Sequence, residues 1–172
     1  MRWLRFSVLT VFLAVLQASA ILNLLSVTNL HITPNLLLIL LVYLAINCNS
    51  YDAIITSFAL GFAADLVSPT IGPYFLSFGI LGSALAHIRK VILLNKTQHQ
   101  AGAIFLTGIA TGAVARFFAG FTGDAESLGS LTIIIVTAMY SAIIYFLIKW
   151  FLALTVRWLG VGVHRFGDKP NM

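Results

Sequence analysis

Six apolar stretches separated by short polar loops make up almost the whole chain. Hydrophobic residues account for 60% of the sequence and charged residues for only 9%. A water-soluble domain of 172 residues could not bury that much apolar surface, so most of it must face lipid or other membrane helices. The pattern predicts an all-α integral membrane protein, with a single six-helix transmembrane domain over residues 1–166 and a short cytoplasmic tail at 167–172. The predicted spans are about 4–25, 34–46, 53–67, 74–88, 101–121 and 128–151.

The first stretch allows a second interpretation, as a signal peptide. Arg2 and Arg5 precede the apolar run, and Ala18-Ser19-Ala20 matches the small-residue site at which signal peptides are cleaved. The apolar run continues to Leu25, which suits an uncleaved span better. The next three stretches are short, because about 15 residues of helix cover only ~22 Å of a hydrocarbon layer of ~30 Å. They therefore need burial by neighbouring helices, local thinning of the bilayer or extension at their ends.

The basic residues lie before the first predicted span, in the loop after the fourth and after the sixth, while the turn at 47–52 has none and does not bear on orientation. The loops between them, at 27–33, 68–72 and 122–130, contain no Lys or Arg. The positive-inside rule then predicts that both termini lie in the cytoplasm, and the three tryptophans fall at span ends on that side, where indole rings favour the interface. Nine of the ten Lys and Arg residues lie on the predicted cytoplasmic side: Arg2, Arg5, Arg89, Lys90, Lys96, Lys149, Arg157, Arg165 and Lys169.

Two ionisable residues, Asp65 and Arg116, lie inside predicted spans. A charge in hydrocarbon costs on the order of 3 kcal/mol or more, so each needs a partner, water or a functional reason. Both lie near the predicted outer ends of spans that run outward, which predicts an intramembrane ion pair between them. Snorkelling to the outer interface and a substrate-binding or proton-carrying role are the alternatives.

Small residues recur every four positions on the two spans that carry these charges. Each set forms one stripe along a helix face, and small residues let helix backbones approach closely. We therefore expect both stripes to be packing faces buried in protein. The third span has Ala53, Ser57 and Gly61 before Asp65, and the fifth has Gly108, Gly112 and Gly120 around Arg116.

Motifs of enzyme, cofactor and metal sites are missing from the sequence. It has no phosphate-binding loop, no dinucleotide fingerprint and no zinc-protease motif. The single cysteine, Cys48, excludes an internal disulfide, and no two of the four histidines have ligand spacing. The basic residues are scattered between spans and make no face for nucleic acid. We therefore expect no enzymatic activity, no cofactor, no metal and no nucleic-acid partner.

Two segments between residues 34 and about 91 resemble the bacterial rod shape-determining protein MreD family. The first is Thr33-Pro34-Asn35-Leu36-Leu37-Leu38, because the family has a proline, then Asp or Asn, then a leucine run. The second runs from Gly61 to Gly72 and resembles the family pattern G-x-x-x-D-L-x-S-x-x-x-G. The residues that match the family motifs are Pro34, Asn35, Gly61, Asp65, Ser68 and Gly72.

The resemblance implies a six-helix fold similar to the S component of energy-coupling-factor vitamin transporters. It implies a non-enzymatic scaffold of the cell-elongation complex in the bacterial cytoplasmic membrane. The implied partner is MreC, a single-span protein with a periplasmic coiled coil. Through MreC the scaffold would help regulate a penicillin-binding transpeptidase and the RodA glycosyltransferase, in a complex connected to MreB filaments. The alternative is a true S component, the substrate-binding subunit of a small-molecule transporter.

Overall fold

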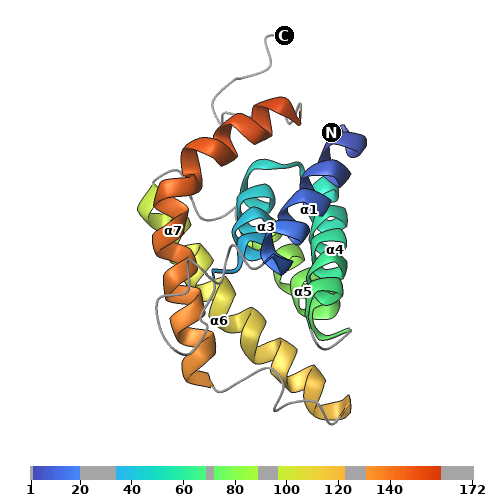
Figure 1. The fold of residues 1–172 in the computed structure, drawn as a ribbon, viewed down its shortest axis with the longest axis vertical. Helices are drawn as coiled ribbons and strands as arrows, with labels where there is room; N and C mark the ends of the chain where they lie inside the picture. Colours follow the sequence, from blue (N-terminus) through green and yellow to red (C-terminus); the bar gives the residue numbers. More distant parts are fainter. Residues whose placement is uncertain (1, 20–33, 69–71, 89–96, 123–130, 160–172) are drawn as a thin grey trace.

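The computed structural model describes residues 2–19, 34–68, 72–88, 97–122 and 131–159. These residues form a bundle of α-helices, and no strand occurs among them (Figure 1). Each of the six predicted spans overlaps one of the described helices. The helices are α1 (Trp3–Ala18), α3 (Leu36–Asn47), α4 (Ser50–Val67), α5 (Pro73–Ile88), α6 (Thr97–Thr122) and α7 (Leu131–Trp158).

Only half of the described helices are long and apolar enough to cross a bilayer on their own. These three segments are Ser50–Val67, Gln98–Phe121 and Thr132–Thr155. Helices α1, α3 and α5 are apolar but shorter. The end of the first predicted span, residues 20–25, lies outside the described residues, as do most of the predicted loops and the predicted tail at 167–172.

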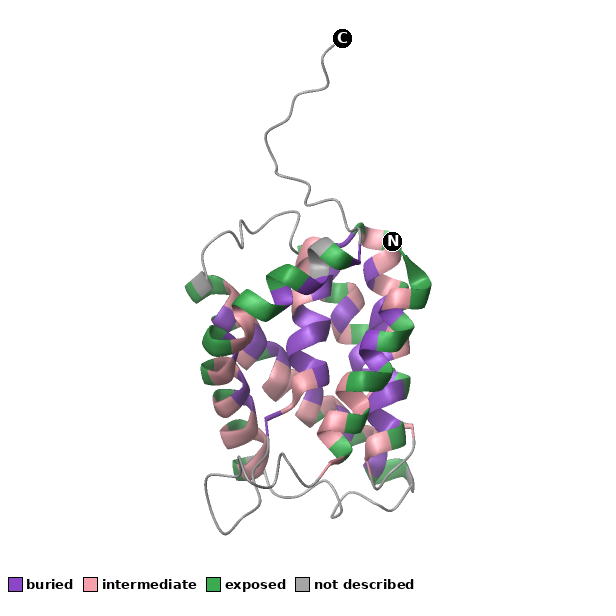
Figure 2. Cartoon of the chain, turned by 45° about the horizontal axis from the view of Figure 1, so that its top comes forward, coloured by how far each residue is buried: buried purple, intermediate pink, exposed green. Residues whose placement is uncertain are grey.

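Helix α3 is the core of the bundle. Its sequence is apolar on every side, which is typical of a helix buried all round. It contacts each of the other five described helices, and none of its residues is exposed (Figure 2). At 12 residues, or about 18 Å, it is too short to span the hydrocarbon, so it depends on its neighbours at both ends. Its fully buried side chains include Leu37, Ile39, Leu40, Leu41 and Leu44.

The remaining helices pack around α3 in two groups. The most extensive contact in the bundle joins α4 and α5, and the next joins α6 and α7. Helix α1 lies against α3 and α4, and α5 also contacts α6. The first and last described helices meet at one end of the bundle, where the N–H of Arg2 donates to the carbonyl of Leu159 (Figure 1). We call this the terminal end, and the opposite end, where α3 and α5 begin, the far end.

Candidate functional site

The start of α5 at the far end lacks the usual side-chain cap. Gly72 precedes the helix with a φ of +114°, a left-handed conformation that favours glycine. Pro73 then occupies the first helical position, where its missing N–H matters least. The next two N–H groups, of Tyr74 and Phe75, have no acceptor within the helix. They need an acceptor from elsewhere in the protein.

Asp65 of α4 supplies that acceptor. Its Oδ1 accepts from the N–H of Tyr74 at 2.9 Å, and its Oδ2 accepts from the N–H of Phe75 at 2.8 Å. The carboxylate is 2% exposed and faces the positive end of the α5 dipole. Charge-assisted bonds of this kind explain how a carboxylate is accommodated inside an apolar helix pair. Asp65 therefore fastens the end of α4 to the beginning of α5.

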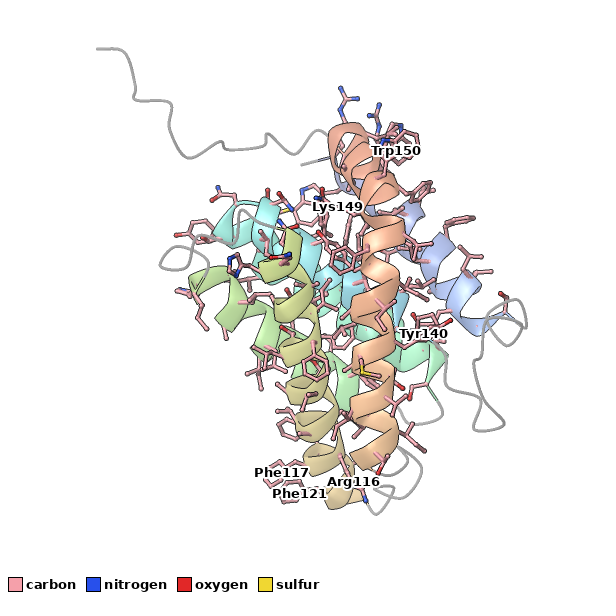
Figure 3. The ribbon with its side chains drawn as sticks, turned by 90° about the vertical axis from the view of Figure 1, so that its left-hand side faces the viewer. Arg116, Phe117, Phe121, Tyr140, Lys149 and Trp150 are labelled. Atoms are coloured by element: carbon pink, nitrogen blue, oxygen red, sulfur yellow. The ribbon has the colours of Figure 1, made fainter. Side chains whose placement is uncertain are left out.

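The sequence prediction gave Asp65 a different partner, Arg116. That residue lies half-buried on α6 near the far end (Figure 3). Each oxygen of Asp65 accepts from a backbone N–H at the start of α5. The Asp65–Arg116 ion pair stays a prediction. The signal for the backbone partner was the Gly72-Pro73 helix start, which offers two amides and no cap of its own.

Gly61 allows the same two helices to touch. A Cβ at this position would lie 2.8 Å from the Cα of Phe75 and 2.8 Å from the carbonyl oxygen of Tyr74. One helical turn earlier, the buried Ser57 side chain fills the space where a Cβ on Gly82 would lie. Ala53 is fully buried as well. The stripe on α4 thus lies against α5, with Gly61 and Asp65 on one continuous contact. Ser68 follows as the cap residue at the end of α4, where its N–H donates to the carbonyl of Ala64 at 2.9 Å.

The start of α3 is held by three parts of the chain. The Asn35 side chain accepts from the N–H of Leu38 at 2.9 Å, as a helix cap does. Gln17 of α1 accepts from the N–H of Leu37 at 3.2 Å, and its amide nitrogen lies 3.4 Å from the Asn35 side-chain oxygen. The N–H of Asn35 donates to the hydroxyl of Ser141 on α7 at 3.0 Å. Pro34, directly before this cap, is buried.

Sequence reasoning identified Asn35 here and missed Gln17 and Ser141. Gln17 is a polar side chain within the apolar run of the first predicted span, and this was the available signal. Ser141 gave none, because a serine in a membrane helix usually bonds its own backbone. Its hydroxyl indeed donates to the carbonyl of Thr137 at 2.8 Å while accepting from Asn35.

The glycine stripe on α6 is only partly a packing face. A Cβ at Gly108 would lie 2.9 Å from the Cβ of Ala138, and one at Gly112 would lie 2.3 Å from a methyl group of Ile134. These two glycines therefore set the close approach of α6 to α7. Gly120 departs from the expectation of a buried stripe, because it is exposed and a Cβ there would meet nothing within 4 Å. The reason is that α6 continues past its contact with α7 at this point.

A cavity of about 130 Å³ lies between the two capped helix starts and the α6–α7 pair. Its polar lining consists of Asn35, Tyr74, Thr111 and Thr137, and the remaining lining residues are apolar or glycine. The lining carries no ionisable side chain other than the Tyr74 phenol. Pockets that enclose drug-sized ligands usually measure about 300–1,000 Å³. This cavity suits a few waters or one side chain.

The described part of the chain contains no group of three His, Cys, Asp or Glu side chains that could hold a metal ion. Cys48 is buried at the end of α3. At the far end, the Asp65 carboxylate, the Asn35 side chain and the Ser141 hydroxyl each bond to a group from another part of the bundle.

Comparison with known proteins gives one match. The model of a protein family described as the rod shape-determining protein MreD matches residues 1–159, which is most of the chain. No curated protein matches the sequence, and no solved structure matches the fold.

Proposed function

The chain belongs to the family of the rod shape-determining protein MreD, and from this membership we propose that it is a non-enzymatic membrane scaffold of the cell-elongation complex. The family match over residues 1–159 carries the proposal, because the family acts in the determination of rod shape. The interlocked helix starts at the far end support a structural role. The polar side chains there serve to fix helices to one another, as a scaffold requires.

We place the bundle in the bacterial cytoplasmic membrane as six spans with both termini in the cytoplasm. The three long apolar helices support this, together with the alternation of basic loops. The short helices α1, α3 and α5 would then cross the membrane because other parts of the protein cover them. α3 is covered by five other helices, and its polar start and that of α5 are satisfied by protein groups at the membrane depth where water is scarce.

The proposed partner is MreC, whose single span would pack against an exposed helix face. Helix α1 offers a suitable face, with Leu4, Val8, Val11 and Val15 between 61% and 84% exposed. Their spacing of four, three and four residues is that of a helix–helix seam. Binding there would connect the chain indirectly to the penicillin-binding transpeptidase, to RodA and to MreB, and so to lateral peptidoglycan synthesis.

The alternative function is that of an S component for a small-molecule transporter. The cavity at the far end is the observation that favours it, since it lies between helix starts and has four polar lining residues. Its volume of about 130 Å³ and its lack of charged lining residues weigh against recognition of a vitamin. We therefore favour the scaffold.

Affinity purification from the native membrane in mild detergent, followed by mass spectrometry, tests the two functions against each other. Recovery of a single-span coiled-coil protein with a wall synthase is the result expected of the scaffold. Recovery of a multi-span coupling protein with two ATPases would overturn the scaffold and favour the transporter subunit.

Bulky substitutions test the face on α1. Val8→Trp and Val11→Trp should reduce co-purification of co-expressed MreC, because an indole cannot fit a seam built for valine. The matched controls are Ile143→Trp and Leu147→Trp, at positions on α7 that are similarly exposed. Equal recovery of MreC with all four variants would remove α1 as the binding face while leaving the scaffold function intact.

A further inference from the structure

We infer that the terminal end of the bundle carries a binding site for the headgroup of an anionic phospholipid. The site lies where the first turn of α1 meets the last turn of α7 (Figure 1). It consists of Arg2, which precedes α1, Trp3 and Arg5 of α1, and Trp158 of α7, and we call it the Trp–Arg corner. The inference needs only that the bundle lies in a membrane and is independent of the proposed partner.

The corner is built by contacts between residues more than 150 positions apart. The Arg5 Nη1 donates to the carbonyl of Trp158 at 2.6 Å, across a sequence separation of 153. The Arg5 guanidinium also lies 5.0 Å from the centre of the Trp158 ring, within the range of a cation–π contact. The Arg2 N–H donates to the carbonyl of Leu159 at 3.2 Å. A cation is stabilised at this position, because the carbonyl end of a helix dipole is negative.

The contacts of Arg5 and Arg2 with the end of α7 leave guanidinium N–H groups available to a ligand. A guanidinium has five N–H donors, and the Trp158 carbonyl takes one of those of Arg5. Arg2 is exposed, and neither α1 nor α7 contains an Asp or Glu that would neutralise the pair. The nearest acidic residue in the helices that begin or end here is Asp52, in the first turn of α4. Arg2 and Arg5 are three positions apart at the start of α1, and guanidiniums suit the oxygens of a phosphate, which they bind in bidentate fashion.

The surroundings of the corner favour a lipid over a free phosphate. Trp3 and Trp158 are about half exposed, and indole rings favour the level of lipid headgroups. The exposed side chains of Leu154 and Trp150 precede Trp158 at intervals of four residues, which places them on the same face of α7. The last turns of α7 (Leu131–Trp158) bend across the terminal end of the bundle toward α1, so they lie at its surface (Figure 1). The arginines would thus face the lipid headgroup, and the indole rings and apolar side chains beside them would contact the glycerol and acyl chains.

Tryptophan fluorescence in lipid nanodiscs tests the inference without any mutation. The chain has three tryptophans, Trp3, Trp150 and Trp158, all in the segments that meet at the terminal end. The full-length protein is placed in nanodiscs that contain brominated phosphatidylglycerol or, at equal mole fraction, brominated phosphatidylcholine. We expect several-fold stronger quenching by the brominated phosphatidylglycerol, because each basic side chain enriches an anionic lipid roughly fivefold.

Charge removal tests the residues. Arg2→Gln and Arg5→Gln should bring the two quenching values together, whereas Arg116→Gln, which removes the same charge near the far end, should leave the preference unchanged. Equal quenching by both lipids with the natural sequence would overturn the site. So would an identical loss of preference in all three variants, which would indicate net charge alone. Protection of the tryptophans from both brominated lipids would overturn it as well, in favour of a protein contact.

Discussion

Helices α3 and α5 begin at the same end of the bundle, and their first turns are completed in different ways. α3 has its own cap, Asn35, which amides and hydroxyls from α1 and α7 support. α5 has a glycine at that position and takes the carboxylate of Asp65 from α4. The first N–H groups of α3 have acceptors on two neutral side chains, whereas those of α5 depend on one buried carboxylate. The two starts should therefore respond very differently to mutation.

The largest effect is expected from Asp65→Ala. It removes the acceptors of two buried N–H groups, each worth about 1–3 kcal/mol, so we expect a loss of about 3 kcal/mol in the free energy of unfolding. Asp65→Asn keeps one oxygen and should lose about half as much. Thermal unfolding in detergent, followed by tryptophan fluorescence, measures both. A loss below about 0.5 kcal/mol in Asp65→Ala would break the contrast between the two helix starts.

Gly61→Ala should rank second. The added Cβ would meet backbone atoms of Tyr74 and Phe75 at 2.8 Å, and forcing a group into packed backbone costs about 2 kcal/mol. Gly120→Ala is the control, because its Cβ meets nothing within 4 Å and alanine favours a helix by up to about 1 kcal/mol. The same unfolding measurement should separate the two variants in opposite directions. Equal melting temperatures would argue against a close α4–α5 contact.

Asn35→Ala should cost about 1 kcal/mol, the usual value for a helix cap. The Gln17 side chain lies beside Asn35 and can still accept from Leu37, so part of the turn remains satisfied. The double variant Asn35→Ala/Gln17→Ala should cost more than the two single changes added together. Strict additivity in melting experiments would mean that the two amides act independently, and would weaken the contrast with Asp65.

The smallest effect concerns the predicted pair of Asp65 and Arg116. If the pair exists, a double-mutant cycle with Asp65→Asn and Arg116→Gln should give a coupling of roughly 0.5–1 kcal/mol, modest because backbone amides already hold the carboxylate. Asp65→Asn with Gly120→Ala supplies the uncoupled reference cycle. Coupling no larger than in that reference would remove Arg116 as a partner.

The sequence predicts the helices well where proline or glycine marks an end. Pro34 and Gly72-Pro73 lie next to the starts of α3 and α5, and Ser68 caps the end of α4. The start of α6 has no such marker, and the helix begins at Thr97, four residues before the predicted position. The end of α7 extends to Trp158, because apolar periodicity continues beyond the length needed to cross a bilayer.

The partners at the site were harder to predict than the residues. Asp65 is recognisable in the sequence as a charge that needs a partner, and opposite charge points to Arg116. The backbone N–H groups that bond to it cannot be recognised from residue types. Likewise, the contact of Asn35 with Ser141 joins residues 106 positions apart, and no local pattern encodes it. The sequence thus indicated several polar residues of the site, but their hydrogen-bond partners depend on the tertiary structure.

That long separation has a consequence for how the protein is made. α3 emerges early from the ribosome, while Ser141 follows 106 residues later, or roughly 5–20 s at ordinary rates of translation. During this interval the backbone N–H of Asn35 lacks the hydroxyl that accepts from it in the folded chain. The start of α3 therefore gains its full set of hydrogen bonds only after α7 has been synthesised. A chain that ends before α7 would leave this N–H at the far end of the bundle without the Ser141 hydroxyl as its acceptor.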